Sequence, residues 1–248
     1  MSFTGIAYLC DGFELIFRKG IKRFCFVPIL INILLYLLLG NIAIRAFSNL
    51  MGFASAGLPD WLGFLIVLAW LLFGVLALII VGYSFTIVAM IIGSPFHGLL
   101  AEKVASELGY RKFEHAWSAK EILTMTTHAL LREGKKLLYI LPRAIGVFIL
   151  TLILSPVPIL NIFVPAITFL WAAWSMSVQF VDYPADNDGV TIPDMLTTMR
   201  EKRTDCFWLG GGTVFLLSIP VLNIFVIPLA VAAATKFWLI ELAPDTGT

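Results

Sequence analysis

The chain has 248 residues, of which 60% are hydrophobic and 13% are charged. Soluble globular domains are about half apolar and about a quarter charged, so this composition is typical of an integral membrane protein. The formal net charge of +1 excludes the strongly basic character of nucleic-acid binders, and we expect no nucleic-acid partner. The three cysteines, Cys10, Cys25 and Cys206, lack metal-ligand and redox spacing, which favours buried thiols and no metal site.

The N-terminal segment predicts a helix that lies on the membrane surface. In a helix over residues 2–19, Ile6, Cys10, Phe13 and Phe17 share one face, and the charged side chains point away from it. This segment carries acidic charges, and no small-residue cleavage site follows the next apolar run. Both features are unlike a signal peptide, so we expect no cleavage.

Two uncharged runs follow, at residues 24–44 and residues 61–92. A spanning helix needs about 20 apolar residues, so each run predicts one membrane crossing. The second run is longer than a bilayer requires, and a helix over it must tilt or protrude. We expect the segment between them, residues 40–60, to be a loop.

Residues 97–141 are polar and predict amphipathic cytoplasmic helices. One of them is expected to begin at Ser118, where a Ser-x-x-Glu pattern fits a capping box, and to be broken or kinked at Pro142. Charged side chains here either form a solvated face or, like Glu102, lie beside an ion route. We interpret His97 as a hydrogen-bonded structural histidine, with proton transfer as the alternative.

The last two apolar segments contain a repeated phrase. Residues 144–181 and residues 206–240 share the pattern Pro-x-Leu-Asn-Ile-Phe-Val, which places a helix-stopping proline and a turn-forming asparagine in mid-run. Two crossings and a turn need about 44 apolar residues, more than either uncharged run provides. We therefore predict two helical hairpins that enter the bilayer partway and return, with proline-kinked full spans as the alternative. The predicted tips are Pro158, Asn161, Pro220 and Asn223.

The basic residues predict the orientation. They gather before the first span, between the second span and the first hairpin, and between the two hairpins, whereas Arg45 alone lies on the other side. The positive-inside rule then places both termini in the cytoplasm, whether or not the hairpins cross the bilayer. Short hairpins that face lipid favour burial against further copies of the chain, so we expect a homo-oligomer.

Residues 20–23 form the candidate anion site. Lys22 and Arg23 stand just before the first spanning helix, where unpaired N–H groups and the helix dipole attract anions. Gly20 lets an anion approach the backbone closely, and Ile21 completes the segment. The alternative is that the two cations only anchor the helix at the lipid headgroups.

Two charged features flank the first hairpin. Arg143 stands where the chain re-enters the bilayer, which suits either a pore mouth or a phospholipid contact. At the other end, Asp182, Asp186 and Asp188 lack the full spacing of a calcium loop, and we interpret them as part of a turn. Thr191 is then predicted to cap a short helix.

Several of these segments resemble the CysZ-type bacterial sulfate permeases. The resemblance rests on Gly-Ile-Lys-Arg-Phe at 20–24, Ser-Pro-Phe-His-Gly-Leu-Leu-Ala-Glu at 94–102, Leu-Pro-Arg-Ala at 141–144, Val-Asp-Tyr-Pro at 181–184 and the paired Leu-Asn-Ile-Phe-Val phrases. It implies sulfate uptake across the inner membrane for cysteine synthesis, and a fold of two long spanning helices with partly inserted hairpins. It also implies sulfate binding at Gly20, Ile21, Lys22 and Arg23, although Lys22 stands where the family commonly has arginine.

Together these observations predict an all-α integral membrane protein. We expect one membrane domain over residues 1–248, with two long transmembrane helices, two partly inserted helical hairpins and amphipathic cytoplasmic helices. The predicted function is a sulfate permease or channel of the bacterial inner membrane, with sulfate and membrane lipid as partners. We expect no enzyme activity and no cofactor, because catalytic and nucleotide-binding patterns are missing from the sequence. A non-transporting scaffold or accessory subunit is the alternative, and both a passive channel and a coupled carrier fit the permease.

Overall fold

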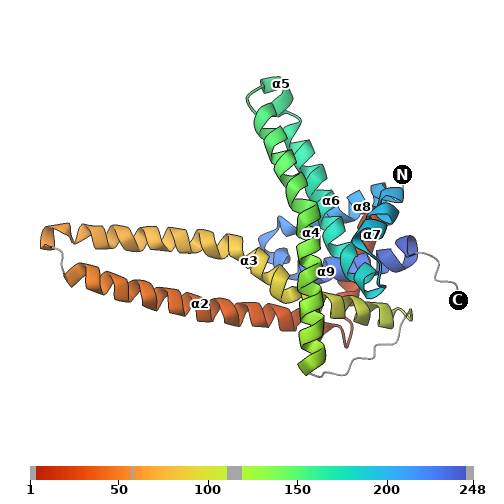
Figure 1. Cartoon of the computed structure of the whole chain (residues 1–248), viewed down its shortest axis with the longest axis horizontal. Helices are drawn as coiled ribbons and strands as arrows, with labels where there is room; N and C mark the ends of the chain where they lie inside the picture. Colours follow the sequence, from red (N-terminus) through yellow and green to blue (C-terminus); the bar gives the residue numbers. More distant parts are fainter. Residues whose placement is uncertain (1–3, 57–58, 111–118, 244–248) are drawn as a thin grey trace. The chain divides into compact units, whose positions relative to one another are not determined.

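The computed structural model describes residues 4–56, 59–110 and 119–243, and within these ranges its regular structure is entirely helical (Figure 1). The elements are α1 (Thr4–Ile16), α2 (Lys22–Ala56), a 3-10 turn (Asp60–Leu62), α3 (Phe64–Glu107), α4 (Ala119–Leu154), α5 (Pro158–Asn161), α6 (Val164–Asn187), α7 (Ile192–Glu201), α8 (Arg203–Leu217), α9 (Pro220–Phe237) and a final π-helical turn (Trp238–Leu242). The capping box predicted at Ser118 lies outside the described residues.

Four helical stretches among the described residues are long and apolar enough to cross a membrane. They are Leu37–Ala56, Thr124–Leu154, Pro158–Asn187 and Phe225–Leu242. Together with the composition, they make the chain an all-α integral membrane protein, the fold class that the sequence predicts. In the second predicted span, the side chains of residues 78–92 lie outside the described ones.

The chain divides into two compact units, of which the smaller, Phe26–Gly93, consists of most of α2 and the first part of α3. There the two helices run side by side (Figure 1). The rings of Phe47 and Phe73 stack with centroids 4.0 Å apart. The predicted loop at residues 40–60 is wrong, because α2 is 35 residues long and continues through Gly40. A single glycine costs a helix only about 1 kcal/mol, which does not end a helix with apolar residues on both sides.

The larger unit, Met1–Cys25 with Ser94–Thr248, contains the buried hydrophobic core and is called the core unit below. In it, α6 packs on α4, α8 and α9, and α1 packs on α8 and α9. The alanines of α9, Ala230 and Ala232 to Ala234, are buried, and their small side chains let neighbouring helices approach closely. This packing makes α9 the central helix of the core unit.

Close packing of α6 on α8 depends on Gly210. A Cβ atom at this position would overlap the carbonyl oxygen of Ala173, a backbone atom that cannot move aside. We expect Gly210→Ala to lower the apparent melting temperature in detergent by about 5–10 °C, because overpacking costs about 1–3 kcal/mol. Gly146→Ala is the matched control, since its Cβ would meet open space on α4. Equal melting temperatures for the two variants would contradict this packing.

Prolines lie inside several of the described helices, Pro184 in α6 and Pro228 in α9 among them. α3 runs through Pro95, and α4 runs through Pro142 to Leu154. Of the predicted break or kink at Pro142, the structure excludes the break, and the kink stays a prediction. An internal proline removes one backbone hydrogen bond, and long apolar helices in membrane proteins tolerate this loss when neighbouring residues adjust.

The repeated phrase marks the two places where the chain reverses. In the first hairpin, α6 returns beside α4 from the tip at α5 (Figure 1), and in the second, α9 follows α8 after a turn at residues 218–219. Pro158 and Pro220 are the first residues of α5 and α9, where the missing N–H would have no partner in any case. Pro158 and Asn161 are exposed, while the side chains of Pro220 and Asn223 lie outside the described ones.

The arms of the two hairpins differ in length. α8 has 15 residues and reaches about 22 Å, less than a hydrocarbon core of about 30 Å. α4 and α6, with 36 and 24 residues, are long enough to cross. The short α8 agrees with partial insertion of the second hairpin, whereas Phe225–Leu242 in its returning arm is long enough to cross, so the depth at which either hairpin enters the bilayer stays a prediction.

Candidate functional site

The predicted anion site is built on the turn between α1 and α2. Gly20 has a φ of 97°, the left-handed conformation that glycine adopts without strain. The Ile21 N–H donates to the Arg18 carbonyl oxygen at 3.2 Å, and the Ile21 side chain is fully buried. α2 then begins at Lys22. The buried isoleucine and the glycine turn together hold Lys22 and Arg23 at the start of a long helix.

The two cations of this turn face solvent. Lys22 and Arg23 are exposed, and neither forms an ion pair in the part of the chain that the structure describes. An ion pair of α3 lies beside Gly20: a Cβ atom on Gly20 would be 3.5 Å from Cε of Lys103, 3.7 Å from Oε1 of Glu107 and 4.0 Å from Nζ of Lys103. Lys103 forms an ion pair with Glu107 at 2.9 Å, so its charge is partly compensated. Local sequence patterns do not reveal Lys103, because it reaches the turn from the far end of α3.

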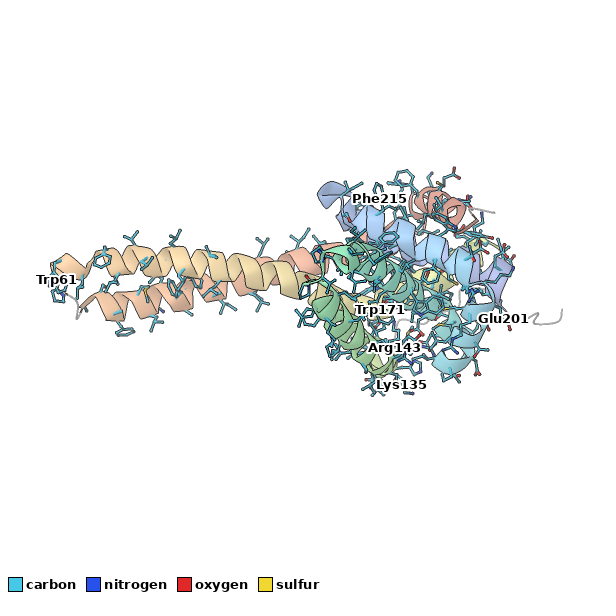
Figure 2. All side chains as sticks on the ribbon, turned by 90° about the horizontal axis from the view of Figure 1, so that it is seen from above. Trp61, Lys135, Arg143, Trp171, Glu201 and Phe215 are labelled. Carbon is cyan, nitrogen blue, oxygen red and sulfur yellow. The ribbon has the colours of Figure 1, made fainter. Side chains whose placement is uncertain are left out.

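The two predicted pathway residues lie on different helices. Glu102 is partly buried on α3, and Arg143 is exposed. Figure 2 shows Arg143 on α4. The Arg143 Nη1 donates to the Tyr139 carbonyl oxygen at 2.7 Å, and its Cζ lies 3.9 Å from the centroid of the Tyr139 ring. These contacts orient the guanidinium group along α4. A role for Glu102 or Arg143 in an ion route stays a prediction.

A buried network of ion pairs joins α4 to α6. On α4, the Arg132 Nη2 lies 2.8 Å from Asp182 Oδ1, and its Nη1 lies 2.8 Å from Asp186 Oδ1. Lys136, one helical turn further, lies 3.0 Å from Asp182 Oδ2 and 2.8 Å from Glu133 Oε1. Lys136 and Asp182 are each only 1% exposed. Buried charges are stable only when they are paired and hydrogen-bonded, so each cation of this network depends on its carboxylates.

Polar side chains extend the network to α3. The Tyr183 hydroxyl donates to Glu133 Oε1 at 3.1 Å, and the Gln179 amide donates to the Tyr183 oxygen at 3.0 Å. His97 on α3 lies with its Nδ1 3.3 Å from the same hydroxyl. The predicted structural role of His97 therefore fits its buried contact with Tyr183.

The network carries more negative than positive charge. It contains two cations, Arg132 and Lys136, against three carboxylates, those of Glu133, Asp182 and Asp186. With its cations already paired, it offers no positive charge to a further anion. Its physical effect is to fix α4 against α6, and it leaves the turn at residues 20–23 as the better oxyanion site.

The network corrects the interpretation of the acidic segment. Asp182 and Asp186 do not belong to a turn, because α6 continues to Asn187. The helix tolerates them because Arg132 and Lys136 neutralise them across the interface. The predicted cap is confirmed: the Thr191 hydroxyl accepts the Asp194 N–H at 3.4 Å at the start of α7.

A sequence signal for this network exists. Two cations four residues apart, at 132 and 136, match two carboxylates four residues apart, at 182 and 186. Residues four apart share one face of a helix, so each pair presents its charges on a single face. Complementary pairs on two apolar helices predict that the two faces meet.

His97 gives the fold a predictable response to acid. Burial, with a smaller contribution from the charge of Lys136, lowers the pKa of His97 to about 3. In the unfolded chain the pKa is about 6.5, so the unfolded state takes up the proton first, and stability is lost as the pH falls below that value. At pH 5 we expect this to cost about 2 kcal/mol relative to pH 8.

The measurement is the apparent melting temperature of the wild type and of His97→Asn between pH 8 and pH 5. Asparagine cannot titrate in this range, and its amide can still reach the Tyr183 hydroxyl. We expect the variant to lose less stability on acidification than the wild type. Parallel curves for the two proteins would show that His97 takes up its proton equally well in the folded state.

The fold and the site define an all-α integral membrane protein with a cationic turn at the start of an apolar helix. Residues 8–228 match the family described as "Sulfate transporter CysZ/Etoposide-induced protein 2.4". The chain therefore belongs to this family.

Curated relatives extend the match over almost the whole chain. A protein named "Sulfate transporter CysZ" from Pseudomonas paraeruginosa is 41% identical over 240 residues, which cover 97% of this chain and 96% of the relative. A protein of the same name from Pseudomonas fluorescens is 40% identical over 238 residues, covering 96% and 94%. One from Vibrio cholerae is 36% identical over 245 residues, covering 97% and 94%.

Proposed function

We propose that this protein mediates sulfate uptake across the bacterial inner membrane. The observation that carries the proposal is the near full-length similarity, at 36–41% identity, to proteins named as sulfate transporters. The apolar helices of the structure support a place in the membrane. In the cell, the sulfate would supply the sulfur for cysteine synthesis.

The cationic turn is the proposed capture site. Sulfate would meet the ammonium group of Lys22, the guanidinium group of Arg23 and the backbone N–H groups from Gly20 onward. The support is geometric: both cations are exposed without an ion pair in the described residues, and they stand at a helix start, where the dipole favours anions. Ile21 would contribute through its backbone and through the buried side chain that holds the turn in place.

We also propose which residues line the route that sulfate follows beyond the capture site. Glu102 and Arg143 are the proposed pathway residues, and the hairpin tips are proposed to close the route or to pack against further copies of the chain. Both termini are proposed to lie in the cytoplasm, as the distribution of basic residues favours. A passive channel and a coupled carrier both fit this arrangement.

Two other classes of function are less favoured. A non-transporting scaffold would need the fold, but it would not need unpaired cations at residues 22 and 23. An enzyme acting on membrane lipids would need a catalytic cluster, whereas the curated relatives are named as transporters. The exposed cations at residues 22 and 23 and the names of the relatives both support transport as the function of this chain.

Uptake of radiolabelled sulfate into liposomes that hold the purified wild-type chain tests the proposal. Protein-free liposomes of the same lipid give the background. We expect uptake above this background that saturates with sulfate concentration or is competed by unlabelled sulfate. Folded protein in the liposomes without uptake would overturn the proposal and favour an accessory subunit.

A further inference from the structure

A basic groove lies between α4 and α7 in the core unit. It has a volume of about 780 Å³. Its walls come from α4, from the turn before α7 and from the exposed side of α7. Four cations line it, namely Arg132, Lys135, Arg143 and Arg200. Among the described residues, no carboxylate is part of its lining.

Three of the four cations have no counter-charge. Arg132 pairs with Asp182 and Asp186 and is thereby neutralised. Lys135, Arg143 and Arg200 are exposed and form no ion pair within the described part of the chain. The groove therefore presents an excess of positive charge to solvent.

One carboxylate, that of Asp194, lies next to this lining, because its partner Thr191 is itself a lining residue. Asp194 lies in the first turn of α7, where its carboxylate accepts a hydrogen bond from the Thr191 hydroxyl at 2.5 Å. Asp194 completes the start of its own helix in this way, and its charge complements the positive end of the α7 dipole.

The groove lies where the charged part of α4 meets its apolar part. Arg143 is the last charged residue of α4, and residues 144–154 beyond it are uncharged, with exposed Ile145, Phe148 and Ile149. Lys135 and Arg143 both lie on α4 in Figure 2.

Aromatic residues mark the same level of the helix. The Arg143 guanidinium lies over the Tyr139 ring, and the Tyr139 hydroxyl accepts a hydrogen bond from the Trp174 indole at 3.2 Å. Tyrosine and tryptophan gather at the height of the lipid headgroups, where one end of the side chain is apolar and the other is wet. The groove therefore opens at the boundary between headgroups and hydrocarbon.

We propose that this groove binds the headgroup phosphate of an anionic phospholipid. Lys135, Arg143 and Arg200 would contact the phosphate oxygens, and the acyl chains would lie along the apolar surface of α4 beyond Arg143. Basic pockets at the membrane surface attract anionic headgroups, and arginine suits phosphate because its planar guanidinium donates two hydrogen bonds at once. A free phosphate or sulfate ion has the same oxyanion chemistry but gains nothing from the adjoining apolar surface.

The test is native mass spectrometry of the full chain in detergent, titrated with phosphatidylglycerol or with phosphatidylcholine of the same acyl chains. Wild type is compared with Arg143→Gln, Arg200→Gln and with a control, Arg45→Gln, Arg203→Gln, which loses the same charge elsewhere. Arg45 and Arg203 are exposed, and neither lines the groove. Each basic side chain at an anionic surface contributes about fivefold in affinity, so the groove variant should bind phosphatidylglycerol about thirtyfold more weakly. The control variant should bind it as the wild type does.

Two further arms identify the source of the phosphate and guard against misfolding. Inorganic phosphate and sulfate at millimolar concentration should leave bound phosphatidylglycerol in place. Displacement by either ion would make the groove a free-oxyanion site and overturn the proposal, as would equal binding by the groove variant or by phosphatidylcholine. If the glutamine variant does not fold, two lysine variants replace it. Arg143→Lys, Arg200→Lys keeps both charges, whereas Arg143→Lys, Arg200→Gln loses the charge at position 200. The first should bind phosphatidylglycerol more tightly than the second.

Discussion

Liposomes that hold the Lys22→Ala, Arg23→Ala variant should take up labelled sulfate about 100-fold more slowly than wild type at low sulfate concentration. A hydrogen bond to a charged group contributes about 1.5 kcal/mol or more, so losing two of them costs about 3 kcal/mol in sulfate affinity. The remaining backbone N–H groups of the helix start retain only a weak attraction for the dianion. The measurement is the initial uptake rate at a sulfate concentration below half-saturation.

The matched control is Arg18→Ala, Lys19→Ala. It removes two exposed cations from the same turn, on the other side of Gly20. If capture depends on the helix start, this variant should keep at least about half of the wild-type rate, because surface charges attract mainly through a screened, long-range field. Equal loss in both variants would mean that the turn acts through its overall charge alone.

A single substitution sharpens the same test. Lysine offers a compact charge, whereas arginine offers a planar fork that fits two oxygens of an oxyanion. Lys22→Arg is therefore expected to preserve uptake and to lower the sulfate concentration needed for half-saturation. A strong loss of uptake in this variant would show that the site requires the shape of lysine and not merely a cation.

The second large effect is expected in the buried network. Lys136→Met removes the cation between Asp182 and Glu133, at a position that is 1% exposed. Breaking a buried pair costs about 3–5 kcal/mol, because the remaining charge has lost its partner. We expect the apparent melting temperature in detergent to fall by about 10 °C or more.

Two further variants test whether the loss of stability comes from the buried charge pair. Lys135→Met removes the same charge from the adjacent, exposed position and should shift the melting temperature by no more than about 2 °C. Lys136→Met, Asp182→Leu removes both partners and should be more stable than Lys136→Met alone, since no uncompensated carboxylate remains at 182. A double variant as unstable as the sum of its single changes would show that the two residues are not coupled.

The network also explains how the end of the first hairpin opposite its tip is held. Arg132 and Lys136 lie on a part of α4 that is otherwise exposed, and their partners lie on the buried end of α6. A hydrophobic contact could slide along either helix, whereas charged pairs at 2.8–3.0 Å hold only one register. The position of α4 in turn shapes the adjoining basic groove, which Arg132 also lines, so a change in the network would alter the groove.

Several features could be predicted from the sequence because they follow from local rules. The membrane class follows from composition, and the reversals of the chain follow from the two repeated phrases with Pro158 and Pro220. The cap at Thr191 follows from side-chain chemistry within one helical turn. The loop at residues 40–60 was predicted wrongly, and α4 does not break at Pro142, because the apolar residues around both positions favour helix more strongly than one glycine or one proline opposes it.

By itself, then, the sequence determined that this protein is a helical membrane protein, where its chain reverses, and that two adjacent cations stand at the start of its first long helix. Only the tertiary structure decided which distant residues meet. Lys103 lies beside Gly20 without any local pattern that indicates it, and the matched charge spacing of α4 and α6 becomes a set of contacts only where Arg132 and Lys136 meet Asp182. The physical reason is that periodicity fixes which face of a helix is polar, whereas the packing of whole helices fixes which polar faces come together.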